Sequence, residues 1–408
     1  MAECGSAKET MISVQEAIER LAVAHRTFDE DDDDKPDATQ LSFPGQLDIL
    51  IDLYTTCIPR IKLRRKTSSE TIEPLLIDLE EVIRLSGSLA SSEEGRSLIS
   101  SVSRLVIRFG SWARSSDNQR DEIQKCDKLL ESLLDCTLIT HEHSIKASLA
   151  QRTLESLYPR LASRSSVPPD WEAGKEAVSG AINAYSSLGI TTDSVITRPL
   201  PSRMMIYAHA APNMTAPAHL AKLVHVIVSS IQANCALDEA LTILLYGLAP
   251  LKVPRSHLSE EVIYPLFAVI PPLSSSHPDP LIRHQAFRIL SALLASCPPV
   301  VRLQRLRELT VDENFPQMRV AAVGLVREAV LEGLSNPPHL FASPRFFDIF
   351  GPILFRPNPP DLLSDQRLSF ESFQESSESA RLVECLGTYY IILLRDTGNL
   401  VSELLSVL

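Results

Sequence analysis

Two segments in the second half of the chain repeat one another at a fixed offset, and this feature constrains the fold more than any other. The segment DPLIRHQAFRIL begins at Asp279, and the segment FPQMRVAAVGLV begins at Phe315. Aligned residues lie 36 positions apart: Pro280 and Pro316, Arg283 and Arg319, Ala286 and Ala322, and Ile289 and Leu325. A repeat of this size cannot bury its own apolar face and needs neighbouring copies stacked against it. The chain is therefore expected to form an array of helical repeats.

The order of residue types within each repeat has a physical reason. Proline is tolerated at the first position of a helix, where its missing N–H would have no helical partner. The small residue lets neighbouring helices approach closely, and the five-donor fork of the arginine suits it to reach neighbouring loops or acidic groups between layers. The pattern resembles the second helix of HEAT repeats, which have two helices in about 40 residues. We therefore predict an all-α fold, a HEAT-like helical-repeat solenoid.

Composition and periodicity favour the same fold class. The 408 residues are 44% hydrophobic and include only 14 glycines, whereas barrels and sandwiches need many tight turns. Apolar residues recur at helical spacing, and one further helix is expected to begin with Pro74 in its first turn. The other expected helices include 11–28, 98–112, 122–138, 142–157, 171–188, 218–233, 238–248, 258–270 and 380–408, the last with a turn at 396–399.

Shifts in composition along the chain suggest its domain organisation. Proline residues among small and polar ones mark the stretch 189–215 as a boundary between two helical halves. The acidic run EDDDDK at 30–35 reads as a solvated loop, and 361–379 is rich in serine and glutamate. The expected parts are an N-terminal helix and acidic loop (1–44), an N-terminal helical-repeat half (45–188), a Pro-containing linker (189–215), a C-terminal HEAT-like half (216–360), a polar loop (361–379) and terminal helices (380–408).

Charge and cysteine usage restrict the partners and the compartment. The net charge of −12 argues against nucleic acid as a partner. Seven scattered cysteines without a Cys-x-x-Cys pair are typical of a reducing compartment. The sequence has no signal-peptide layout at its beginning and no apolar run that approaches the length of a membrane span. We expect a cytoplasmic protein, possible also in the nucleus, that is monomeric on its own and does not bind membranes.

The motifs of common catalytic and cofactor sites are missing. The sequence contains no Walker loop, no G-x-G-x-x-G, no H-E-x-x-H and no G-x-S-x-G. His141 and His143 would point to different sides of a helix, so we expect them to cap a helix or to face water rather than to bind a metal. Cys297 closes a helix and is expected to be buried and inert. The sequence therefore predicts a protein without enzymatic activity, cofactor or metal.

A longer stretch, from Asp279 to Asp361, resembles a known family. The segments DPLIRHQAFRILSALLASCPPVVRLQRLRELT, PQMRVAAVGLVREAVLEGL, FASPRFF and GPILFRPNPPDLL follow one another in order, and together they resemble the glomulin, ALF-four and YAP-binding protein family of HEAT-like proteins. The resemblance implies a non-catalytic protein whose C-terminal half binds the RING subunit of a cullin-RING ubiquitin ligase and restrains ubiquitin transfer. Fungal relatives imply an alternative, an adaptor for a stress-response transcription factor, in the oxidative stress response, or for a kinetochore complex. A structural adaptor without inhibitory action is a further alternative.

Arginines of the C-terminal half are the candidate partner-binding residues. They are Arg302, Arg305 and Arg307, joined by Arg319 and Arg327. Arginine is enriched at protein interfaces because its fork pairs with carboxylates and its plane stacks on rings. Ordinary salt bridges between repeats are the alternative interpretation. A second basic strip, KLRRK at 62–66, is compatible with a nuclear-localisation patch or with a solvated turn.

Overall fold

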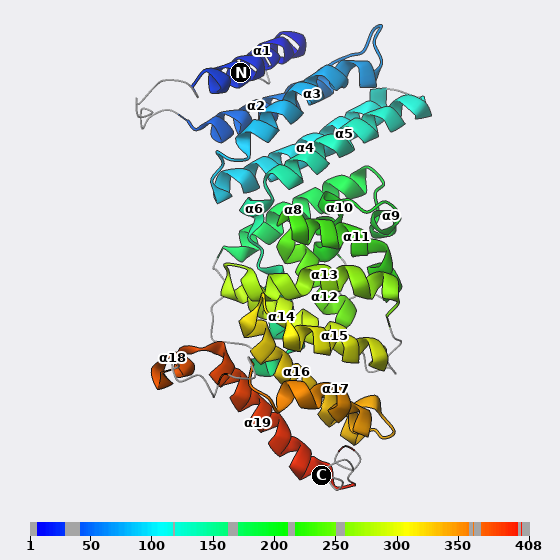
Figure 1. Ribbon diagram of the computed structural model, residues 1–408. Coiled ribbons are helices and arrows are strands. Elements are labelled where there is room, and N and C mark those ends of the chain that lie inside the picture. Colours follow the sequence, from blue (N-terminus) through cyan, green and yellow to red (C-terminus); the bar gives the residue numbers. More distant parts are fainter. Residues whose placement is uncertain are drawn as a thin grey trace. The chain divides into compact units, whose positions relative to one another are not determined.

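The computed structural model describes residues 6–28, 41–116, 119–161, 170–210, 217–249, 258–358, 362, 369–398 and 401. Every regular element in these residues is a helix (Figure 1). The chain divides into two compact units, Met1–Gly247 and Leu248–Leu408, called here the N-terminal and C-terminal units. The acidic run predicted as a loop at 30–35 lies outside the described residues.

The N-terminal unit is a stack of helices in which α1 packs on α2, α2 on α4, α3 on α5 and α4 on α8. Leu47, Ile51 and Tyr54 lie on one face of α2 and are fully buried. The helices are α1 (Ala7–Phe28), α2 (Phe43–Cys57), α3 (Ser68–Ser86), α4 (Ser92–Ser116), α5 (Arg120–Thr140), α6 (Glu142–Ile145), α7 (Leu149–Leu157), α8 (Trp171–Ser187), α9 (Thr192–Thr197), α10 (Pro201–Ala210), α11 (Pro217–Ala233) and α12 (Leu237–Leu248).

The start of α3 corrects the prediction for Pro74, which lies inside the helix rather than in its first turn. A capping box sets the true start: the amide of Glu70 donates to the Thr67 hydroxyl (3.3 Å), and the amide of Thr67 donates to the Glu70 carboxylate (3.0 Å). These bonds satisfy two amides that a helix start leaves without partners. The basic strip at 62–66 precedes this cap as an exposed bend.

The helix predicted over 142–157 is wrong, because it is broken into α6 and α7. Lys146 and Ser148 both adopt left-handed backbone conformations, with φ of 46° and 48°. The break brings the carbonyl of Ile145 against Gly174 of α8, so closely that a Cβ on Gly174 would lie 1.7 Å from that oxygen. Periodicity could not reveal the break, because the apolar residues on both sides keep helical spacing.

Two carboxylates hold the broken ends in place. Glu142 of α6 accepts a hydrogen bond from the amide of Ala236, just before α12 (2.5 Å). In return, Asp238 of α12 accepts from the amides of Leu149 and Ala150, at the start of α7 (2.6 and 2.8 Å). Glu142 thus accepts from an amide at the N-terminal end of α12, and Asp238 accepts from amides at the N-terminal end of α7. Negative charge is favoured at the N-terminal end of a helix.

The close approach at Gly174 predicts a large effect for a small substitution. Gly174→Ala should lower the free energy of unfolding of the N-terminal unit by about 2 kcal/mol, because the added methyl group has to displace backbone. Gly180→Ala, in the same helix, is the matched control: its Cβ would meet Ser103 at 3.9 Å, an ordinary contact. That control should be neutral or stabilising by about 0.5 kcal/mol. Urea unfolding of both variants tests the prediction, and equal stabilities would contradict it.

The described part of the predicted linker at 189–215 contains two helices, α9 and α10. The Thr191 hydroxyl accepts from the amide of Ser194 (3.4 Å), and the Ser194 hydroxyl accepts from the amide of Thr191 (3.0 Å), which caps α9. The compact units themselves divide after Gly247. The domain boundaries drawn from composition stay predictions.

The C-terminal unit contains the repeat found in the sequence. Helix α13 packs on α14, α15 on α16, and α16 on α19. Its helices are α13 (Glu260–Ser276), α14 (Pro280–Ala295), α15 (Pro299–Val311), α16 (Pro316–Ser335), the short 3₁₀ helix η4 (Leu340–Ala342), α17 (Pro344–Leu354), α18 (Phe370–Glu375) and α19 (Ser377–Arg395). Thus α18 and the start of α19 fall within the predicted polar loop at 361–379, of which 361 and 363–368 lie outside the described residues.

The aligned prolines and alanines of the repeat occupy equivalent places, whereas the aligned arginines have different partners. Pro280 and Pro316 each begin a helix, and the aligned Ala286 and Ala322 are fully buried. Arg283 donates to the carbonyl oxygens of His277 and Pro278 in the preceding loop. The prediction of an all-α, HEAT-like helical-repeat solenoid is confirmed.

Candidate protein-binding surface

Two of the predicted site residues, Arg302 and Arg305 of α15, are used inside the C-terminal unit. The Arg302 guanidinium donates to Glu332 of α16 (2.7 Å) and lies 5.6 Å from the ring centre of Phe341. Arg305 donates to Glu308 (2.5 Å) and lies over the rings of two aromatic residues of α13, Tyr264 and Phe267 (5.0 and 5.6 Å). The structure therefore places both guanidinium groups where they connect α15 with the helices beside it.

Arg319 and Arg327 of α16 connect that helix with α19. Arg319 forms an ion pair with Glu378 (3.5 Å), and Arg327 forms one with Glu384 (2.8 Å). Arg307 differs from the other four candidates: its side chain is exposed and makes no ion pair with any described residue. The structure does not gather the five arginines at one site, and their role in partner binding stays a prediction.

A buried ion pair that sequence reasoning missed fixes α19 to the rest of the unit. The Arg381 guanidinium donates through two nitrogens to the Glu378 carboxylate (2.7 and 2.6 Å). It also donates to the carbonyl oxygens of Ile353 and Arg356 (2.7 Å each), at the end of α17. Only 2% of the Arg381 side chain is exposed. A buried pair with all its donors used is rigid, and it sets the rotation of α19 about its axis.

Removing this pair should be costly. Arg381→Met is expected to lower the free energy of unfolding of the C-terminal unit by about 3 kcal/mol, because the buried Glu378 would keep only its longer ion pair with Arg319 (3.5 Å) and two backbone carbonyls would lose their donor. The matched control is Arg327→Met, which removes the half-exposed pair with Glu384 and should cost less than about 1 kcal/mol. Denaturant unfolding followed by circular dichroism measures both values. Similar losses in the two variants would show that the Arg381–Glu378 pair is not special.

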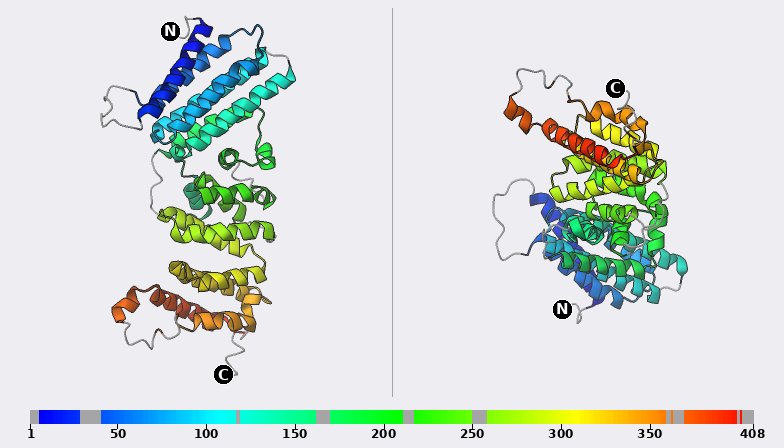
Figure 2. Two further views of the ribbon diagram at one scale, coloured as in Figure 1. Left: turned by 45° about the horizontal axis from the view of Figure 1, so that its top comes forward. Right: turned by 90° about the horizontal axis from the view of Figure 1, so that it is seen from below.

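The outer face of α19 is apolar and uncovered among the described residues. The α19 stripe consists of five side chains that are 55–68% exposed: Val383, Leu386, Tyr390, Leu393 and Leu394. The opposite face carries the buried Arg381, Cys385, Thr388 and Ile392. Figures 1 and 2 show α19, coloured red, at one side of the C-terminal unit and against α16. Large exposed apolar surfaces of this kind mark sites of protein association.

The α19 stripe was not singled out from the sequence. The run LVECLGTYYIILL at 382–394 is too short for a membrane span and contains Glu384. Within the described residues, no helix has the length and apolar character to cross a membrane. A helix with apolar side chains on two faces needs a neighbour on each face. Such a pattern in residues 382–394 was the signal that could have revealed the α19 stripe.

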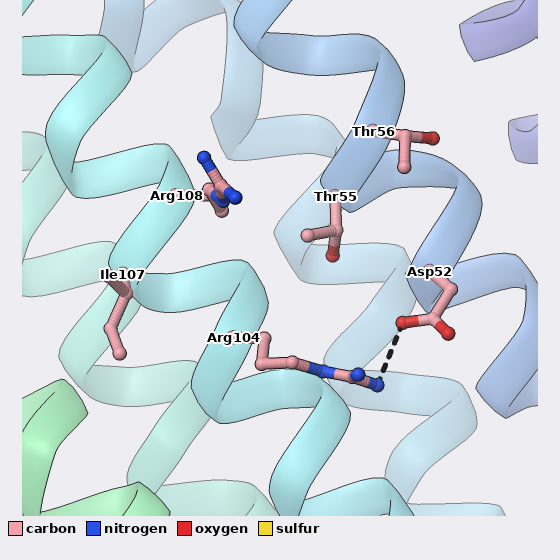
Figure 3. Close-up of a pocket in the computed structure, with 6 residues that line it drawn as sticks. All are labelled: Asp52, Thr55, Thr56, Arg104, Ile107 and Arg108. Carbon is pink, nitrogen blue, oxygen red and sulfur yellow. Dashed lines mark hydrogen bonds and ion pairs between the residues drawn. The ribbon is translucent and has the colours of Figure 1, made fainter. Parts of the chain in front are cut away.

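A pocket of about 380 Å³ between α2 and α4 offers little chemistry (Figure 3). The Thr55 hydroxyl donates to the backbone of its own helix, and so does that of Thr56. Arg104 donates to Asp52 (3.0 Å), which leaves Arg108 as the cation of the pocket without a described partner. One exposed arginine does not make an anion site.

Other candidate reactive groups are buried within the helical stack. Burial raises the pKa of Cys297 to about 12, so its thiol is protonated at neutral pH, in agreement with an inert cysteine. His141 is the N-cap residue of α6, as expected, but its side chain makes no capping hydrogen bond. The expectation that it faces water is wrong, because its side chain is fully buried and hydrogen-bonded to Ser86 (3.2 Å), whereas His143 is exposed. No group of three or more His, Cys, Asp or Glu among the described residues could hold a metal ion.

The burial of His141 predicts a pH dependence. Burial lowers its pKa to about 4, below the usual value of about 6.5, so the unfolded chain takes up the proton first as the pH falls. The stabilising contribution is complete above pH 6.5 and is lost on the way to pH 4. The stability advantage of the wild type over His141→Gln should therefore shrink by about 2 kcal/mol between pH 7 and pH 4.5.

The comparison isolates His141 from other titrating groups. Burial raises the pKa of Asp238 to about 6, which gives a contribution of the opposite sign, but that contribution is present in both proteins and cancels. His225→Gln changes an exposed histidine of α11 in the same unit and should leave the pH dependence of wild type intact. Urea unfolding at several pH values is the measurement, and parallel curves for wild type and His141→Gln would contradict the assignment.

The chain is a helical-repeat protein with an exposed apolar face on α19. A family model described as an uncharacterised protein family, YAP/Alf4/glomulin, matches residues 204–408. This match covers half of the chain, so the chain belongs to the YAP/Alf4/glomulin family. Among curated proteins, none matches the sequence.

Proposed function

We propose that this protein is a non-enzymatic protein-binding regulator. The observation that carries the proposal is the α19 stripe, an exposed apolar surface on a helix that is fixed in place. The stripe lies within the residues that the family model matches. A stacked helical scaffold provides long surfaces for binding, whereas enzymes need convergent polar groups in a cleft.

The partner proposed is the RING subunit of a cullin-RING ubiquitin ligase, and the effect is restraint of ubiquitin transfer. This choice rests on the glomulin resemblance of residues 279–361, which lie in the C-terminal unit. Arg307 is the candidate arginine that is open to such a partner, because the other four candidates form ion pairs within the unit. The chain acts as a monomer in the cytoplasm, with access to the nucleus.

A second candidate is an adaptor for a kinetochore complex or a stress-response transcription factor. The name of the matching family model refers to the kinetochore, and its description includes YAP. The two candidates differ in their partner and in their effect on ubiquitin transfer, so the same binding experiment separates them.

Pull-down with a purified RING subunit, followed by an in vitro ubiquitination assay, tests the proposal. The wild-type chain should bind the subunit and slow ubiquitin transfer. Arg307→Glu should weaken binding about tenfold, because a charge reversal at an interface replaces attraction by repulsion. Arg345→Glu, the same change at an exposed arginine of α17, should bind like wild type.

Each result has a definite meaning. Absence of RING binding by the wild type would reject the ubiquitin-ligase proposal, and binding without slower transfer would favour a structural adaptor. Equal binding by Arg307→Glu and Arg345→Glu would remove Arg307 from the interface. Direct association with a stress-response transcription factor or a kinetochore protein, without RING binding, would establish the second candidate.

A further inference from the structure

The basic strip at 62–66 is held in solvent by a bend whose two ends are fixed. Its four cationic side chains are exposed and make no ion pair with any described residue: Lys62, Arg64, Arg65 and Lys66. The indole of Trp112 donates to the carbonyl oxygen of Ile61 before the strip (3.1 Å), and Thr67 caps α3 after it. On a chain of net charge −12, this strip presents four unpaired positive charges to a negatively charged partner.

The strip leads directly into a hydroxyl residue at a defined spacing. Arg64 and Arg65 lie three and two positions before Thr67, and no other pair of adjacent arginines occurs in the sequence. Many protein kinases choose their substrates by charge, because carboxylates in the substrate groove pair with guanidinium groups on the N-terminal side of the accepting hydroxyl. The spacing of the two arginines therefore favours a kinase with an acidic groove as the partner of the strip.

Backbone conformation and burial separate Thr67 from the other hydroxyl residues that follow an arginine by three positions. A kinase has to reach the backbone around the accepting hydroxyl, and the interior of a helix already uses its backbone groups. Thr67 is extended, with φ of −73° and ψ of 171°. Among the other described candidates, Ser68 and Thr310 are buried, and Ser111 and Ser291 lie inside α4 and α14. Thr67 is therefore the described hydroxyl that fits an acidic kinase groove.

Access to the Thr67 hydroxyl requires the first turn of α3 to open. The side chain of Thr67 is half-buried, and its hydroxyl accepts from the amide of Glu70 (3.3 Å). The opening also breaks the hydrogen bond from the Ser69 hydroxyl to Glu122 of α5 (2.5 Å). Helix ends open locally at a small cost in free energy, and the residues before Thr67 already lie outside a helix. A kinase therefore has to displace one turn rather than unfold the stack.

We propose that Thr67 is phosphorylated by an arginine-directed protein kinase, which recognises the site through Arg64 and Arg65. The kinase transfers the γ-phosphoryl group of ATP to the Thr67 hydroxyl. The bond between the γ-phosphorus and the threonine Oγ1 forms, the bond between the γ-phosphorus and the bridging oxygen of ADP breaks, and a carboxylate of the kinase takes the hydroxyl proton. The site lies in the N-terminal unit and goes beyond the proposed function, on which it does not depend.

The modification changes the charge of the strip. Phosphothreonine carries a charge of about −2 at neutral pH, which offsets about half of the four positive charges before it. An acidic partner that binds the strip is attracted less strongly after phosphorylation. Thr67 is thus placed to regulate what the strip can bind.

A kinase assay on the full chain tests the proposal. The chain is incubated with ATP and the catalytic subunit of cyclic-AMP-dependent protein kinase, which has an acidic substrate groove, and mass spectrometry locates the phosphate. Wild type should be phosphorylated at Thr67. The double variant Arg64→Ala, Arg65→Ala should react at least about tenfold more slowly, because two charge-assisted pairs are lost. The matched control is Arg108→Ala, which removes an exposed arginine three positions before Ser111 and should react like wild type.

Two further measurements separate recognition from access. Thr67→Ser keeps both the capping hydroxyl and the phosphate acceptor, so it should be phosphorylated at the same position. A synthetic peptide with the sequence of residues 61–70 gives the rate of the open site. The folded chain should react about 5 to 30 times more slowly than the peptide, which is the factor for opening a capped turn.

Three results would overturn the proposal. They are phosphate at Ser111 or Ser291 in place of Thr67, an unchanged rate in the double arginine variant, and phosphorylation of the peptide without phosphorylation of the folded chain. Circular dichroism verifies that each variant keeps the fold. The assay contains no RING subunit, so its outcome is independent of the pull-down that tests the proposed function.

Discussion

Each helix in this chain has more apolar surface than it can bury alone, and only a neighbouring helix can cover it. This constraint explains why buried alanines recur where helices approach, as at Ala286 and Ala322. It also explains why α14 and α16 both begin at proline, since a proline at the first position of a helix fixes where the helix starts in each repeat. The same constraint applies to α19, because its outer side chains are apolar like those of a buried face but are not covered by any described residue.

Polar side chains add a second level of order to the apolar stack. In the C-terminal unit, arginine makes most of the polar contacts between helices. Arg302 of α15 pairs with Glu332 of α16, and Arg327 of α16 pairs with Glu384 of α19. The Arg327–Glu384 pair is half-exposed and contributes little stability, whereas Arg302 is buried; the fixed geometry of both pairs sets how neighbouring helices are rotated against each other. The buried Arg381–Glu378 pair does the same where no water can reach. Arginine is used both at protein interfaces and in ion pairs between helices of one chain, so the positions of arginines in the sequence could not separate these two roles.

The sequence was sufficient for the fold because the fold depends on periodic features. Offsets, helix-start prolines and apolar spacing are local, and most of the helices they predict are present among the described residues with shifted ends. What failed depends on contacts between distant segments. The break at Lys146 requires Gly174 to lie beside Ile145, and the burial of His141 requires Ser86 on another helix. Most of the candidate site was likewise beyond reach, because the partners of Arg302 and Arg319 lie 30 and 59 residues away.

The reciprocal carboxylates of the N-terminal unit have a consequence for how it comes apart. Repeat stacks usually unravel from one end, because each layer touches only its neighbours. Here Glu142 and Asp238 bind amides 94 and 89 residues away along the chain, and they close the intervening helices into a ring of covalent and hydrogen bonds. Displacing α6 or α7 breaks hydrogen bonds to α12, and displacing α12 breaks the hydrogen bonds that hold α6 and α7. This part of the molecule therefore behaves as one cooperative block inside an otherwise sequential stack.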